Sequence, residues 1–233
     1  MRAHPFHALV FDFDGTLADT AIDFAGMKLA LYGLVREYLP HAPLPGDTPA
    51  LEWLRAMKDA LPGDARRHIP AIERRAADII RAAEIHAAEC GALFPFTRPL
   101  LAALRADGIA TAVITRNCTD AVLTLFPDIH AAADVFLSRD DIANVKPHPD
   151  HVGAALRAIG IAPQHALMVG DHPLDIETGR HSGTATAGVL TGQADRARFL
   201  ACGAHHIADD ADTLVRALRA EGRLVPAPPL VPN

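Results

Sequence analysis

The sequence has few cysteines, no long apolar run and no excess of positive charge. Its cysteines, Cys90, Cys118 and Cys202, are odd in number and widely separated, with no C-x-x-C spacing. Such cysteines indicate reduced thiols rather than a disulfide framework. No apolar run reaches the length of a bilayer-spanning helix, and the N-terminus leads into the first expected strand without a signal-peptide pattern. Together these absences predict a cytoplasmic protein that does not enter a membrane.

The charge balance is mildly acidic, with a formal net charge of −6. This balance argues against a nucleic acid or an anionic membrane as the main partner. The 233 residues are 50% hydrophobic and 21% charged, which is ordinary for a globular protein. That length allows one large domain or a core with an insert. It says nothing about the oligomeric state.

The most informative stretch is Val10-Phe11-Asp12-Phe13-Asp14-Gly15-Thr16-Leu17. The apolar run 8–13 predicts a strand buried on both faces. Asp12 and Asp14 lie at its carboxyl end, where unpaired charge is costly. Because side chains alternate along a strand, we expect both carboxylates to point the same way, and Gly15 to let the chain turn at once. Two adjacent carboxylates repel each other and call for a cation.

A purely helical block follows, over residues 20–92. Its expected helices span 22–38, 48–60 and 64–90, with Asp19-Thr20 as the first N-cap and a kink or split at Pro70. Strands and helices then alternate. We expect strands at 109–114, 135–137, 166–169, 184–190 and 206–207, and helices at 98–106, 117–125, 149–159, 174–181, 194–202 and 210–219.

This alternation predicts an α/β fold, a doubly wound parallel (Rossmann-like) sheet interrupted by an all-helical insert. The expected core comprises residues 1–19 and 93–223, and the insert residues 20–92. The proline-rich tail, residues 224–233, suits neither a helix nor a central strand and is expected to be extended or flexible.

Polar residues follow several of these strands, at the edge where a doubly wound sheet binds ligands. Asp171 and Asp175 are spaced to face one site together with Asp12 and Asp14, and such carboxylates suit Mg²⁺. Thr115 is expected where a helix begins, which favours phosphate. Lys146, held between Val145 and Pro147, could neutralise a phosphate and hold the carboxylates together.

Taken in order, Asp12-x-Asp14-Gly15-Thr16, Thr115, Lys146-Pro147 and Gly170-Asp171-x-x-x-Asp175 resemble the four motifs of the haloacid dehalogenase superfamily. The helical insert resembles the small cap of its phosphoglycolate phosphatase and β-phosphoglucomutase branch. The resemblance implies that Asp12 is the nucleophile and Asp14 the general acid and base. It also implies that Thr115 and Lys146 hold the phosphoryl group.

The same resemblance implies a Mg²⁺ site made by the Asp12 carboxylate, the Asp14 main-chain carbonyl and Asp171, with Asp175 in support. Asn117 could donate to the phosphate or simply cap a helix, and both readings stay open. His172 and Arg116 are more typical of non-catalytic residues. The basic residues of the insert could contact an acidic substrate, but solvated helix faces are the commoner outcome.

The leading hypothesis is therefore a Mg²⁺-dependent phosphatase acting on a small phosphorylated metabolite, with phosphoglycolate as the family analogy. A sugar phosphomutase of the β-phosphoglucomutase type is the alternative within this chemistry. A dehalogenase is disfavoured by Asp14 and by the Asp171–Asp175 pair. A phosphonate-cleaving enzyme would need a cap lysine, and Lys28 and Lys58 lack a supporting motif. A non-catalytic binding module on the same fold is the alternative from another class.

Overall fold

A computed structural model describes residues 5–227 of the chain. The chain divides into two compact units, each described here by itself. One unit comprises Met1–Thr20 with Gly91–Asn233, and the other Ala21–Cys90. Among the described residues, no helix is both long enough and apolar enough to cross a bilayer.

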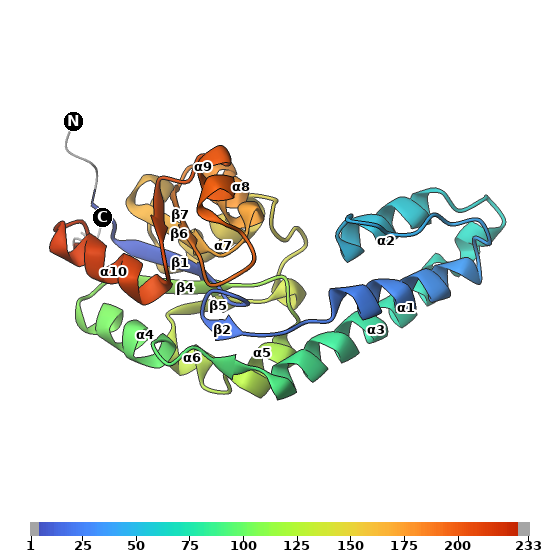
Figure 1. Ribbon diagram of the computed structural model, residues 1–233, viewed down its shortest axis with the longest axis horizontal. Helices are drawn as coiled ribbons and strands as arrows, with labels where there is room; N and C mark the ends of the chain where they lie inside the picture. The colour runs from blue at the N-terminus through green and yellow to red at the C-terminus, as the bar shows by residue number, and fades with distance from the viewer. Residues whose placement is uncertain (1–4, 228–233) are drawn as a thin grey trace, which may run out of the picture. The chain divides into compact units, whose positions relative to one another are not determined.

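The larger unit is built on a sheet of parallel strands in the order β5-β4-β1-β6-β7-β8 (Figure 1). The bounds are β1 (Ala8–Asp12), β4 (Ala110–Ile114), β5 (Val135–Leu137), β6 (Ala166–Gly170), β7 (Ala185–Val189) and β8 (His206–Ala208). The order reverses beside β1, because β4 and β6 flank it on either side. This is the switch point at which a doubly wound sheet binds its ligand.

Helices cover both faces of this sheet (Figure 1). The bounds are α4 (Thr97–Ala106), α5 (Thr119–Leu125), α6 (Ile129–Ala132), α7 (Asp150–Ile159), α8 (Pro173–His181), α9 (Arg196–Ala201) and α10 (Ala211–Ala220). Side chains of β1 alternate between two buried clusters. Leu9 and Phe11 pack with residues of α4 and α10, and Ala8 and Val10 pack with residues of α7. The predicted doubly wound sheet is confirmed, because β1 has an apolar partner on each face.

Strand register brings the polar strand ends together. Asp12, the last residue of β1, pairs with Ile114 of β4, and Phe11 pairs with Val169 of β6. The residues that follow β4 and β6 therefore leave the sheet beside Asp12. Thr115 and Asp171 are the first of the polar residues on these two sides.

The smaller unit is all helical: α1 (Phe24–Arg36), α2 (Ala50–Asp59), the 3₁₀ turn η1 (Ala65–His68) and α3 (Ile69–Cys90). Its buried side chains form their own core, which includes Leu31, Trp53, Ile72 and Ile80. The expected break near Pro70 is confirmed, since η1 ends and α3 begins at Ile69, where a proline in the first turn is tolerated.

The expected N-cap Asp19 is wrong. Asp23 caps α1 instead, since its carboxylate accepts a hydrogen bond from the Gly26 amide. Asp19 lies in β2 (Ala18–Asp19), which pairs in antiparallel fashion with β3 (Ala92–Leu93). These two-residue strands are too short for alternation of side chains to reveal them.

The beginning of the tail is extended and ordered, which agrees with the extended one of the two expected alternatives. Leu224 forms an isolated bridge with Phe6, and the Val225 amide donates to the Phe6 carbonyl at 3.0 Å. The Phe6 amide in turn donates to the Arg223 carbonyl at 2.7 Å, so both backbone groups of Phe6 are bonded to this part of the chain. The prediction for the last part of the tail concerns residues 228–233, which lie outside the described residues.

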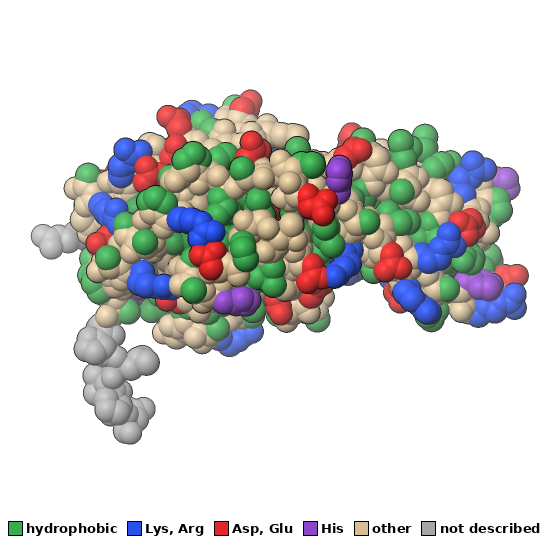
Figure 2. Space-filling view, turned by 90° about the horizontal axis from the view of Figure 1, so that it is seen from below, with side chains coloured by type: hydrophobic (Ala, Val, Ile, Leu, Met, Phe, Trp, Pro, Cys, Tyr) green, Lys and Arg blue, Asp and Glu red, His purple; other side chains and the backbone are tan. Residues whose placement is uncertain are grey.

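The basic side chains of the helical unit mostly have partners on its own surface. Lys58 pairs with Glu73 at 2.5 Å and Arg75 with Glu37 at 2.6 Å. In the space-filling view, Lys, Arg, Asp and Glu are interspersed over this unit (Figure 2). These pairs match the expectation of solvated helix faces rather than a patch for an acidic substrate.

Candidate active site

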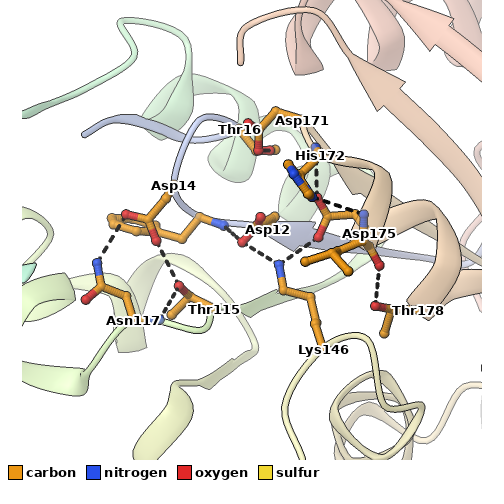
Figure 3. A network of polar contacts seen from close by, with 12 residues as sticks. Asp12, Asp14, Thr16, Thr115, Asn117, Lys146, Asp171, His172, Asp175 and Thr178 are labelled. Atoms are coloured by element: carbon orange, nitrogen blue, oxygen red, sulfur yellow. Dashed lines mark hydrogen bonds and ion pairs between the residues drawn. The ribbon is translucent and has the colours of Figure 1, made fainter. Parts of the chain in front are cut away.

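Asp12 is the buried end of β1, and one of its two oxygens is held firmly. Oδ1 accepts hydrogen bonds from the Lys146 ammonium and from the Phe13 amide, each at 2.7 Å (Figure 3). Among the described residues, no donor is bonded to Oδ2. The fixed Oδ1 orients the carboxylate, and Oδ2 remains available for chemistry.

Lys146 links two carboxylates in the interior. Its Nζ lies 2.7 Å from Oδ1 of Asp12 and 2.7 Å from Oδ1 of Asp175, and its side chain is 3% exposed. Burial alone would lower the pKa of Lys146, but the two ion pairs outweigh burial and raise the pKa above its ordinary value. The residue is therefore a permanent cation beside the nucleophile candidate.

One lysine does not balance the acidic cluster around it. Ligand atoms of Asp12, Asp171 and Asp175 all lie within 4.8 Å of one another. Burial, followed by repulsion from Asp175, raises the pKa of Asp12 well above its usual range. The same two causes raise the pKa of Asp171 to about 7. Three carboxylates against one ammonium leave two negative charges, the amount that a divalent cation would neutralise.

The backbone of two glycines packs closely against the Asp171 carboxylate. A Cβ on Gly15, whose φ is +74°, would lie 2.3 Å from Asp171 Oδ2, and one on Gly192 would lie 1.9 Å from the same oxygen. Thr16 donates its hydroxyl to Asp171 Oδ1 at 3.2 Å. Only glycines allow this close approach. The cradle and the hard oxygen donors fit Mg²⁺, with Asp12 and Asp171 as candidate carboxylate ligands.

Asp175 has both oxygens engaged. Oδ1 binds Lys146, and Oδ2 accepts from the His172 amide at 3.1 Å as part of a capping box at the start of α8. This geometry suits the supporting role that the resemblance implies for Asp175 better than the role of a direct metal ligand. His172 caps the same helix, since its Nδ1 accepts from the Leu174 amide at 3.2 Å.

The Asp14 side chain points away from Asp12, contrary to the expected shared direction (Figure 3). Its Oδ2 accepts from Thr115 Oγ1 at 2.9 Å, and its Oδ1 accepts from Thr20 Oγ1 at 2.8 Å and from Asn117 Nδ2 at 3.2 Å. The reason is that β1 ends at Asp12, so strand alternation no longer governs Asp14. Three donors converge on this carboxylate, which lies just beyond the carboxyl end of β1.

The loop after β4 is held by its own side chains. Thr115 Oγ1 accepts from the Asn117 amide at 3.0 Å, and Asn117 Oδ1 accepts from the Cys118 amide at 2.9 Å. The expected helix start at Thr115–Asn117 is therefore wrong, because these bonds keep the loop out of the helix and α5 begins at Thr119. Asn117 uses its oxygen within the loop and its amide nitrogen toward Asp14.

Some residues of the site had no assigned role in the sequence. Thr16, the last residue of the first motif, contacts Asp171, and Thr20, shortly after that motif, contacts Asp14. A threonine near a motif is too common to predict such a contact. Arg116 offers its main-chain carbonyl to Arg139 Nη1 at 2.8 Å, so its backbone supports the loop after β4.

Known proteins share both the sequence and the fold of this chain. Residues 6–183 match the haloacid dehalogenase-like hydrolase family, and that range contains every predicted site residue. The phosphoglycolate phosphatase of Shigella sonnei is 31% identical over 210 residues, which cover 79% of this chain and 81% of that protein. The N-acetylmuramic acid 6-phosphate phosphatase of Pseudomonas aeruginosa is 28% identical over 204 residues, which cover 82% and 85%.

A solved structure extends the comparison to three dimensions. The crystal structure of a hydrolase from Pseudomonas syringae matches with a TM-score of 0.69, at 20% sequence identity. The match covers 92% of this chain and 98% of that one. At this level of identity the likeness shows a shared fold alone.

Proposed function

Because this chain belongs to the haloacid dehalogenase-like hydrolases and is a phosphatase of that family, we propose that it hydrolyses a small phosphorylated metabolite with Mg²⁺ as cofactor. The observation that carries the proposal is the environment of Asp12. One carboxylate oxygen of Asp12 is fixed by Lys146 and Phe13, and the carboxyl group belongs to a cluster of three carboxylates in which Lys146 supplies a single positive charge.

In the proposed reaction, Asp12 Oδ2 attacks phosphorus, and the bond from phosphorus to the leaving oxygen breaks. Asp14 gives that oxygen a proton, then takes one from the water that attacks the resulting aspartyl-phosphate and frees Asp12. Bound Mg²⁺ would neutralise the repulsion between an anionic nucleophile and an anionic phosphate. We assign its binding to the Asp12 and Asp171 carboxylates and the Asp14 carbonyl.

Three residues are proposed to hold the phosphoryl oxygens. Lys146 supplies a fixed cation, and Thr115 and Asn117 supply a hydroxyl and an amide donor. These last two already converge on the carboxylate oxygens of Asp14, which supports their capacity to bind an anion. Phosphoryl transfer depends mainly on such positioning and charge neutralisation.

The proposed substrate class follows from the relatives. Both curated relatives are named for phosphomonoesters of small carboxylic acids, which makes a phosphoglycolate-like acid the first candidate. The helical unit is proposed to act as the cap that selects the substrate. A cytoplasmic location stays a prediction, drawn from the number and spacing of the three cysteines.

The test is a panel of phosphorylated metabolites incubated with purified protein and MgCl₂, with free phosphate measured. We expect phosphate release from one or a few phosphomonoesters, and loss of at least about 10³-fold in Asp12→Asn, since the amide is not a nucleophile. Turnover in Asp12→Asn equal to wild type would contradict the nucleophile assignment. A sugar phosphate isomerised without phosphate release would favour a mutase.

A further inference from the structure

Thr191 lies in the loop between β7 and α9, 176 positions from the first motif, yet it contacts that motif directly. Its hydroxyl donates a hydrogen bond of 2.5 Å to the Gly15 carbonyl. On the other side of the same residue, the Gly15 amide donates to the Ala18 carbonyl at 2.7 Å. Both peptide groups that flank Gly15 are therefore held.

The peptide group before Gly15 also carries the Asp14 carbonyl. This peptide bond is trans, because the only cis bond in the described residues is Lys146–Pro147. In a trans peptide the C=O and the N–H point in opposite directions. With its N–H bound to Ala18, this peptide turns the Asp14 carbonyl away from Ala18. Thr191 fixes the next peptide, so Gly15 cannot rotate freely despite its lack of a side chain.

Gly192, the neighbour of Thr191, acts on a second residue of the same region. Its Cα approaches the Asp171 carboxylate so closely that a Cβ would lie 1.9 Å from Oδ2. Thr191 and Gly192 are both half-buried, as expected for a loop that closes one side of a site. Thr191 thus holds the backbone next to the Asp14 carbonyl, and Gly192 leaves the space that the Asp171 carboxylate fills.

From this geometry we propose that Thr191 and Gly192 are positioning residues for the Mg²⁺ site. Thr191 sets the orientation of the Asp14 carbonyl through Gly15, and Gly192 sets the position of the Asp171 carboxylate. Neither residue touches substrate in this assignment. The proposal rests on the Mg²⁺ site of the proposed function, so its test measures Mg²⁺ binding separately from turnover.

The test is isothermal titration calorimetry of the full chain with MgCl₂ and no substrate. Thr191→Val keeps the shape of the side chain and removes the donor, whereas Thr191→Ser keeps the donor. Loss of a contact that orients a metal ligand typically weakens metal binding 10- to 100-fold. We therefore expect Thr191→Val to raise the Mg²⁺ Kd at least about tenfold, and Thr191→Ser to stay within about twofold of wild type.

Gly192→Ala is expected to weaken binding more than Thr191→Val, since its Cβ would displace Asp171. Gly153→Ala in α7 is the matched control, because its Cβ would meet only the flexible end of Arg157 at 3.2 Å. Saturating Mg²⁺ should restore most of the kcat of Thr191→Val, whereas the loss of a group that takes part in the reaction itself would not be restored.

Equal Mg²⁺ affinity in wild type and Thr191→Val would overturn the inference while leaving the proposed function intact. A wild-type protein that binds no Mg²⁺ at millimolar concentration would overturn both. If Gly192→Ala fails to fold, the comparison of Thr191→Val with Thr191→Ser alone decides whether the inference holds.

Discussion

At the scale of single residues, Lys146 is the charge on which the buried site depends. It is the only cation bonded to Asp12 and Asp175 among the described residues, and all three side chains are buried. Removing one partner from a buried charge network leaves the others uncompensated, which costs about 3–5 kcal/mol. A buried charged residue of this kind is kept for its task rather than for packing.

We expect Lys146→Met to lower the free energy of unfolding by about 3 kcal/mol at pH 7 without Mg²⁺, and to abolish turnover. Urea unfolding followed by circular dichroism measures the first effect. Lys58→Met is the matched control, because its pair with Glu73 is partly exposed and such pairs contribute less than about 1 kcal/mol. Equal losses in the two variants would show that Lys146 is not compensating the cluster.

The residues that could be predicted from the sequence are those with an unusual local context. Asp12 ends one apolar strand, Asp171 follows another, and Lys146 lies next to a proline, so the sequence around each of them is unusual for a charged residue. Thr191 carries no such mark, since its partner Gly15 is remote in the chain. The direction of Asp14 was also beyond prediction, because it depends on where β1 stops.

At the scale of elements, the loop after β4 is shaped by the turn after β5. The Arg139 amide donates to the Asn117 carbonyl at 3.0 Å, and Arg139 Nη1 donates to the Arg116 carbonyl at 2.8 Å. Asp140 accepts from the Thr119 amide at 2.9 Å. The 3₁₀ turn η2 (Arg139–Asp141) thus binds two carbonyls of the loop and the first amide of α5.

Arg139→Met should therefore loosen the loop that is proposed to bind phosphate. We expect the inhibition constant of inorganic phosphate to rise about three- to tenfold, as for loss of one charge-assisted hydrogen bond. Mg²⁺ affinity should not change, because Arg139 supports the other side of the site. Arg105→Met is the control, since Arg105 donates to the Ala131 carbonyl in a comparable contact elsewhere. An unchanged phosphate constant in Arg139→Met would contradict the supporting role.

Regular elements were predictable because their signals are local. The buried strands β1, β4 and β6 consist mostly of apolar residues. Helix α7 is followed by Gly160 in the left-handed conformation, as a helix-closing glycine predicts. The missed elements are short: α6 and the β2–β3 pair span two to four residues each. Such segments are stabilised by their surroundings rather than by their own sequence.

At the scale of the whole molecule, stability should vary with pH through groups that act in opposite directions. His151 of α7 is fully buried, and its Nε2 contacts the Leu137 carbonyl at 3.1 Å. Burial, aided by the charge of Lys146, lowers the pKa of His151 to about 4. Asp171 has its pKa raised to about 7.

The signs of these two contributions follow from where protons bind. Between pH 6.5 and 4 the unfolded chain protonates its histidine while folded His151 stays neutral, so this contribution to stability falls as the pH falls. Between pH 4 and 7 the folded chain keeps the Asp171 proton that the unfolded chain has lost, so that contribution falls as the pH rises. A pH profile of the wild type alone therefore mixes the two.

Comparison with His151→Gln separates them, because glutamine keeps a donor for Leu137 and cannot titrate. The difference between 6.5 and about 4 corresponds to roughly 3 kcal/mol, at about 1.4 kcal/mol per pH unit. We expect the stability of His151→Gln relative to wild type to increase by up to that amount from pH 7 to pH 4.

Circular dichroism must follow the unfolding, because the single tryptophan, Trp53, lies in the helical unit and does not report on the sheet. His41→Gln, which replaces an exposed histidine, is the control and should leave the profile unchanged. A parallel profile for His151→Gln and wild type would mean that His151 takes up its proton in the folded protein as readily as in the unfolded chain.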